Sequence, residues 1–152
     1  MLFTREVQLA LAFLVNDLGF VDDDEKESAI GQMAVFRKPP LALEVGWYKG
    51  EVRAAFVLDL AFTAEHPVFR PYRSRTFDLG EIIRLRDPAA YRTVPEALRN
   101  QPVFVTRDEQ LPVVLSVMAQ QLRQYAADVL AGDFRMLEEL TRVRYPEGSP
   151  AH

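Results

Sequence analysis

A short stretch of the sequence brings an imidazole close to several guanidinium groups. His66 is followed by Arg70, Arg73 and Arg75. Histidine titrates near neutral pH and can act as a general acid or base, while arginine binds phosphate groups through its fork of N–H donors. These residues are therefore candidates for an anion or ligand site. The alternative is that His66 is an exposed loop residue, since no partner accompanies it at a metal-ligand spacing.

The patterns of known catalytic and metal sites are missing from the sequence. There are no cysteines, which excludes disulfides, thiolate metal sites and cysteine nucleophiles. Ser28, Ser74 and Ser116 lie in no nucleophile-elbow pattern, and the glycines are too scattered to form a phosphate-binding loop. We therefore predict no catalytic residue, no metal and no cofactor, and a non-enzymatic protein is favoured over an enzyme.

A run of acidic residues supports a second hypothesis. Its members are Asp22, Asp23, Asp24, Glu25 and Glu27. The run lacks the alternating ligands, central glycine and final glutamate of an EF-hand, so a calcium site is not expected. It is either a solvated turn or a docking surface for a basic protein partner, because a negative patch speeds association with a positive one. Tyr48 is a further candidate interface residue, because aromatic side chains are enriched in interfaces.

The segment from Arg70 to Arg92 mixes arginines with aromatic residues and suggests a third hypothesis. Arginines beside aromatic rings can hold the phosphates and bases of a single-stranded nucleic acid. The whole chain, however, has a net charge of −4 and a pI of about 5.2, whereas nucleic-acid-binding domains are usually basic. We therefore do not expect a nucleic-acid partner.

The strongest structural pattern is that of a β-hairpin. Apolar and polar residues alternate over 41–48 and again over 51–62, on either side of Lys49-Gly50. Strict alternation around a two-residue turn with glycine is typical of a hairpin that has one buried face. A strand over 30–37 is predicted before the hairpin, and a fourth, short strand over 72–77 after it.

Helices are predicted on both sides of these strands. Their ranges are 4–18, 79–85, 106–131 and 133–143. Gly19 has the character of a residue that ends the first helix, and Asp78 and Glu81 have capping-box spacing at the start of the second. Pro112 lies early in the long helix, which therefore either bends there or begins there.

These elements predict an α+β protein. We expect an N-terminal helix, an antiparallel meander of three to four strands, a short helix, a long C-terminal helix and a final short helix, with the helices packed on one sheet face. A length of 152 residues fits one domain, which we place at 1–145, followed by a flexible tail at 146–152. No apolar run has membrane-spanning length, and no basic segment precedes the first apolar stretch, so we expect no signal peptide and a cytoplasmic protein.

The long predicted helix is apolar around more than half of its circumference, because Val113, Val117 and Leu130 widen its main stripe. A helix of this kind is either enclosed in the core or shared with a partner. Closed two-fold dimers are the commonest oligomers. A homodimer formed through this helix is therefore an expectation.

Four segments, spread over most of the chain, form a recognisable layout. They are residues 18–20, 41–47, 77–83 and 125–133. The layout resembles that of uncharacterised small bacterial α+β proteins, some of which are suspected toxin-immunity proteins. Because its motifs are structural, the resemblance implies the fold and carries over no functional residue. As a function, it implies an immunity-like protein that acts on a protein partner.

These observations favour a non-enzymatic protein-binding domain, immunity-like, that acts through surface complementarity. One alternative is a small-ligand binder or an unrecognised enzyme that uses His66 with the nearby arginines. A second alternative is a nucleic-acid accessory protein that uses the segment Arg70–Arg92. The first predicts a protein partner, the second a pocket that encloses His66 and the arginines, and the third salt-sensitive binding to DNA or RNA.

Overall fold

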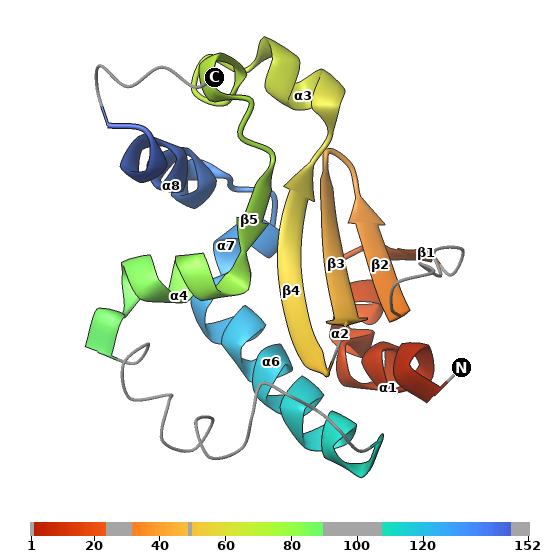
Figure 1. Ribbon diagram of the computed structural model, residues 1–152. Coiled ribbons are helices and arrows are strands. Elements are labelled where there is room, and N and C mark those ends of the chain that lie inside the picture. Colours follow the sequence, from red (N-terminus) through yellow and green to blue (C-terminus); the bar gives the residue numbers. More distant parts are fainter. Residues whose placement is uncertain (1, 24–31, 49, 90–107, 147–152) are drawn as a thin grey trace.

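The computed structural model describes residues 2–23, 32–48, 50–89 and 108–146. It contains a five-stranded antiparallel sheet in which every strand lies beside its neighbour in the sequence (Figure 1). The strands are β1 (Val21–Asp23), β2 (Gln32–Lys38), β3 (Leu41–Tyr48), β4 (Glu51–Leu58) and β5 (Thr76–Asp78). The predicted α+β meander is confirmed, with five strands in place of the three to four expected.

The β3–β4 hairpin follows the predicted pattern. Its register runs from Tyr48 opposite Glu51 to Leu41 opposite Leu58, and Gly50 has a φ of 83°. In β4 the alternation buries Val52, Ala54, Phe56 and Leu58. The strand is shorter than predicted, because the chain turns at Asp59 and residues Leu60–Glu65 form helix α3.

The N-terminal helix begins earlier than predicted and contains a break. It consists of α1 (Leu2–Ala10) and α2 (Ala12–Asn16). The earlier start follows from Phe3, which is fully buried and packs 5.7 Å from the ring of Trp47. The predicted end is confirmed: Gly19 has a φ of 79°, and the amide of the buried Phe20 donates to the Leu14 carbonyl at 3.0 Å.

The acidic segment after this helix starts as a strand, and the prediction of a turn over residues 22 and 23 was wrong. Asp22 lies opposite Phe36 and Asp23 opposite Val35 in the ladder between β1 and β2. Side-chain bonds that sequence patterns do not reveal hold this short strand. Gln8 of α1 donates to Asp22 at 2.7 Å, and Arg37 forms an ion pair with Asp23 at 2.8 Å.

Helix α4 (Leu79–Arg86) has the predicted start and carries both bonds of the capping box between Asp78 and Glu81. The long helix predicted over 106–131 is shorter. Its regular part, α6 (Leu111–Tyr125), has Pro112 in its first turn, after the 3₁₀ turn η2 (Asp108–Gln110), and it ends at Tyr125 because the chain breaks at Ala126. The other helices are α7 (Ala127–Leu130) and α8 (Arg135–Arg144).

The core lies between one face of the sheet and the helices. Helix α1 packs against β2 and α6, and α4 packs against β4, β5, α6 and α8. In Figure 1, α4 and α8 lie beyond β5, while α1 and α2 lie at the β1–β3 end of the sheet. Residues from the sheet and the helices join one cluster, among them Leu43, Phe56, Leu115 and Leu137. The predicted packing of helices on one sheet face is thus confirmed.

Candidate functional site

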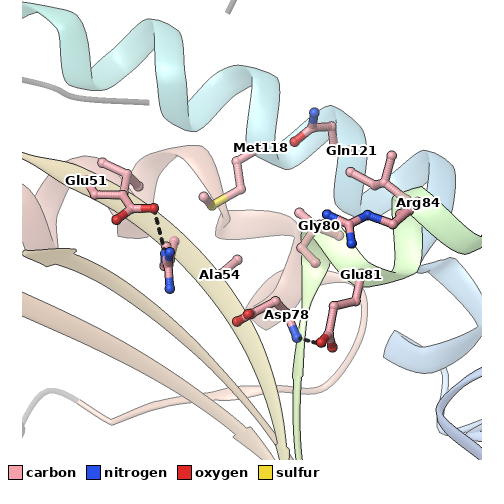
Figure 2. A pocket seen from close by; sticks show the side chains of 12 residues that line it. Glu51, Ala54, Asp78, Gly80, Glu81, Arg84, Met118 and Gln121 are labelled. Carbon is pink, nitrogen blue, oxygen red and sulfur yellow. Dashed lines mark hydrogen bonds and ion pairs between the residues drawn. The ribbon is translucent and has the colours of Figure 1, made fainter. Parts of the chain in front are cut away.

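A groove lies beside the first half of β4, because β5 is much shorter than its neighbour. β5 pairs only with residues Ala55–Val57. At Asp78 the chain caps α4 and leaves the sheet. Within the described part of the chain, no strand pairs with residues 51–54 on this side. The space left between β4, α4 and α6 has a volume of about 520 Å³ (Figure 2).

The open part of β4 directs backbone groups into this groove. The amide of Leu58 donates to Arg75 at 2.9 Å, on the β5 side of the strand. Backbone groups in an antiparallel strand alternate between the two sides, so the amide and carbonyl of Val52, six residues earlier, face the same side. Val52 lies in the half of β4 that β5 does not reach. This part of β4 is therefore a strand edge onto which an extended peptide can add as a further strand.

The groove has an apolar floor and a rim of mixed charge. Its floor includes Val52, Ala54, Leu79, Ile83 and Met118, which are all buried. Figure 2 shows Met118 and Gln121 reaching in from α6, with Glu81 and Arg84 on α4. Such a combination suits a ligand with both apolar and polar side chains.

The charges of the rim are held in place by bonds within the chain. Arg53 donates to Glu51 at 2.7 Å, and this hydrogen bond, followed by the charge of Glu51, raises the pKa of the guanidinium. Glu81 accepts the backbone amide of Asp78 at 3.3 Å and forms an ion pair with Arg144 of α8. These contacts fix the carboxylates before any ligand arrives.

The three predicted arginines lie together at the other end of β4. Arg70 is in the 3₁₀ turn η1 (Arg70–Tyr72), Arg73 follows it, and Arg75 precedes β5. They line a hollow of about 500 Å³ together with Leu60, Thr63 and Ala64 of α3. The structure thus brings together these three members of the predicted anion site.

His66 does not share this hollow. It follows α3 and packs against the rings of Phe62 and Phe69, with centroids at 5.4 and 4.4 Å. Its Nδ1 accepts the Val68 amide at 3.1 Å, and its Nε2 lies 4.0 Å from Glu138. The imidazole is therefore engaged by two aromatic rings and at Nδ1, and it lines neither the hollow nor the groove. The pocket that would enclose His66 with the arginines is not formed by the residues described.

The acidic candidates are only partly described. The carboxylates of Asp22 and Asp23 are bonded to Gln8 and Arg37. Asp24, Glu25 and Glu27 lie outside the described residues. Tyr48 ends β3, where its backbone pairs with Glu51 next to the hairpin turn.

The arginine–aromatic segment does not form one surface. Phe69 and Phe77 are fully buried, and Tyr72 stacks on Tyr145 with its ring centroid at 4.7 Å. Further along, Arg86 forms an ion pair with Asp128, while Tyr91 and Arg92 lie outside the described residues. The buried or stacked rings are not free to hold nucleic-acid bases.

The described residues contain no group of three or more side chains that could hold a metal ion. No helix within them is long and apolar enough to cross a membrane. Away from the groove, hydrogen bonds from Arg135 lower the pKa of Asp133, next to α8, to about 2.

Sequence reasoning missed the groove, although one signal for it was present. It treated Glu51 and Arg53 as the polar face of a strand, and Asp78 and Glu81 as a helix cap. The capping box starts directly after the short fourth strand, whereas β4 is eight residues long. Two adjacent strands of unequal length leave one edge unpaired.

Comparisons of the chain with protein-family models, with curated proteins and with solved structures found no match.

Proposed function

We propose that the protein is a non-enzymatic binding domain that holds an extended segment of a partner protein in the groove beside β4. The observation that carries this proposal is the first half of β4, which no strand among the described residues pairs on this side and whose Val52 backbone groups face a groove of about 520 Å³. Added strands gain affinity from main-chain hydrogen bonds and specificity from pockets for alternate side chains.

The lining of the groove supports a peptide as the ligand in preference to a reacting substrate. Its charged groups include Glu51 and Arg53, which bond to each other, and Glu81, which is bonded to Arg144. Because these charges are already paired within the chain, they suit the recognition of a ligand more than the transfer of a proton to it. Both signs of charge and an apolar floor suit a segment of mixed composition.

The resemblance to suspected immunity proteins suggests which kind of partner the groove would hold. A protein of that kind would recognise a toxin as its partner. The acidic run at residues 22–27 supplies a second contact for a basic partner, since long-range attraction speeds association. On this view the groove holds the partner and the acidic run steers it.

A proline at position 52 tests the edge directly. Val52→Pro removes the amide that faces the groove but no amide of the β3–β4 ladder, and proline is tolerated at such edge positions. Val52→Ala is the matched control, because it shortens the buried side chain and keeps the amide. Affinity capture from lysate of the source organism should recover a partner with the wild type and Val52→Ala, and lose it with Val52→Pro.

Hydrogen exchange provides a readout that needs no variant. With the captured partner bound to the wild type, the Val52 amide should become protected, because an added strand accepts its proton. Circular dichroism and the fluorescence of Trp47 establish that both variants are folded. Capture that is equal for Val52→Pro and Val52→Ala, or a Val52 amide that exchanges as fast in the complex as alone, would refute the proposal.

The expected homodimer through the long helix remains a prediction. The buried residues of α6, among them Leu111, Leu115 and Leu122, belong to the core of a single chain. Val113, which is 58% exposed, is the main apolar residue left on its outer side. Light scattering should report a dimer that Val113→Lys converts to a monomer; a wild-type monomer would remove this expectation.

A further inference from the structure

We propose that the hollow lined by Arg70, Arg73 and Arg75 is a binding site for the phosphate group of a small organic phosphate ester. This site lies at the Leu58 end of β4, away from the groove at residues 51–54, and does not depend on the peptide-binding proposal. Four observations support it: the missing counter-charges, the anchored Arg75, the backbone of Arg73, and the shape of the hollow.

The charges of these arginines are not balanced, unlike those of several other arginines in the chain. Six other arginines form ion pairs with carboxylates: Arg37, Arg53, Arg86, Arg135, Arg142 and Arg144. Arg70 and Arg73 form none with any residue that the structure describes, and no carboxylate lines the hollow. Like charges gathered at one place repel each other, so an anion that enters between them is stabilised.

Arg75 is held in a position that leaves its terminal donors available. Its Nε donates to the Leu58 carbonyl at 3.0 Å, and the side chain is only partly exposed. The two terminal NH₂ groups are the donors that grip a phosphate in a bidentate manner. An arginine that is already oriented loses less conformational entropy when it binds.

The backbone places Arg73 in an uncommon conformation. Its φ of 51° and ψ of 32° are left-handed, and it is the only non-glycine residue with positive φ among those described. Residues in such conformations are often found at ligand sites, where the surrounding structure compensates their strain.

The surrounding structure holds this turn through its neighbour, Ser74. Ser74 is buried, and its Oγ accepts hydrogen bonds from Thr141 and from Arg144 of α8, each at 3.1 Å. The Ser74 amide donates to the Phe69 carbonyl at 3.3 Å. The buried serine thus fixes the chain between Arg73 and Arg75, and the two guanidinium groups are carried to the same hollow.

The shape of the hollow indicates what is attached to the phosphate. Its volume of about 500 Å³ lies in the range of small-ligand sites, roughly 300–1,000 Å³. Inorganic phosphate would leave the side formed by Leu60 and Ala64 uncovered, and Leu60 is 64% exposed. A compact apolar group joined to the phosphate would cover it. The ligand class is therefore a phosphomonoester with a small apolar body.

Phenyl phosphate is a suitable probe, with inorganic phosphate and benzoate as comparisons. Calorimetry at low salt should show one site for phenyl phosphate, weaker binding of inorganic phosphate, which lacks the apolar body, and still weaker binding of benzoate, which lacks the dianion. Affinity for phenyl phosphate should fall as salt is added, because exposed charges are screened.

Two variants separate the site from general attraction to a positive charge. Arg70→Gln/Arg73→Gln should weaken phenyl phosphate binding by at least about tenfold, since each charged hydrogen bond contributes that much or more. Arg5→Gln, at an exposed position on α1, removes one charge elsewhere and should leave the affinity unchanged.

Three results would overturn the proposal. They are the absence of saturable phenyl phosphate binding at low salt, an equal affinity in the wild type and the double variant, and binding of benzoate as tight as that of phenyl phosphate. Both substituted residues are exposed, and circular dichroism of the double variant confirms that it is folded.

Discussion

Replacing Arg73 by glycine should stabilise the protein while it weakens the proposed phosphate site. Arg73 has a φ of 51°, and this left-handed conformation costs an L-residue about 1–2 kcal/mol. Glycine avoids that cost, but it raises the conformational entropy of the unfolded chain, which lowers the stability by about 0.4–1 kcal/mol. The net expectation is a gain of about 0.5–1 kcal/mol in the free energy of unfolding.

The control for this prediction is Arg73→Ala. Alanine also removes the guanidinium, but its Cβ keeps the left-handed strain, so Arg73→Ala should be close to the wild type. The difference between the glycine and alanine variants therefore isolates the backbone. For a chain of this size, a gain of about 1 kcal/mol raises the melting temperature by about 2–4 °C.

Urea unfolding followed by fluorescence measures this difference well. Trp47 is the single tryptophan and packs on Phe3 in the core, so its emission should report global unfolding. Both variants should lose affinity for phenyl phosphate to a similar extent. If Arg73→Gly is no more stable than Arg73→Ala, the conformation of Arg73 is not strained, and one of the supports of the phosphate site is removed.

Three further predictions test other parts of the fold. The pKa of Asp133 is lowered from 3.8 to about 2 by Arg135, so its carboxylate stabilises the folded state above the unfolded pKa. This contribution should fade as the pH falls through 3.8 and about 2. In urea titrations, wild type and Asp133→Asn should therefore differ at neutral pH, and the difference should shrink steadily as the pH approaches about 2. Ser74→Ala should lower the free energy of unfolding by about 1–3 kcal/mol, because it removes the buried oxygen that accepts the Thr141 hydroxyl. Thermal unfolding no different from the wild type would contradict this role. Gly19→Ala should lower the free energy of unfolding by about 1 kcal/mol. The whole loss should come from left-handed strain, because a Cβ there would meet no atom within 4 Å. A melting temperature equal to that of the wild type would count against that strain.

Local patterns predicted the hairpin and the helix ends, because neighbouring residues determine these features. The alternation in 41–48 and 51–58 specifies which face of each strand is buried, and Lys49-Gly50 sets the register. Asp78 and Glu81 form both capping bonds across a single turn. Such interactions need no partner from distant parts of the chain, so they can be predicted from the local sequence.

The features that sequence reasoning misplaced depend on distant partners. Asp22 and Asp23 form a strand because β2 lies alongside them; on their own they have low strand propensity. Leu60 and Phe62 continue the alternation of β4 but belong to α3. Phe62 there packs on His66 and on Phe134, which precedes α8. Tertiary packing outweighs a local pattern in both cases.

The candidate sites show the same division. Arg70, Arg73 and Arg75 were found from their types and spacing, because one short turn carries all three. The separation of His66 from them was not predictable, since it results from the packing of its ring against Phe62 and Phe69. The groove was missed because its one signal, a short strand that ends directly in a helix cap, has to be compared with the length of the neighbouring strand β4.

The sequence by itself determined the α+β class, the hairpin with its buried face, the capped helices and the positions of the arginines. These follow from periodicity and from turn and cap chemistry, which act within a few residues. Only the tertiary structure decided that, among the residues it describes, no strand pairs with the first half of β4 beside α4 and α6 and no carboxylate lines the hollow of the arginines. The physical reason is that a surface is made where segments distant in sequence meet, and their relative lengths and packing set its shape and charge.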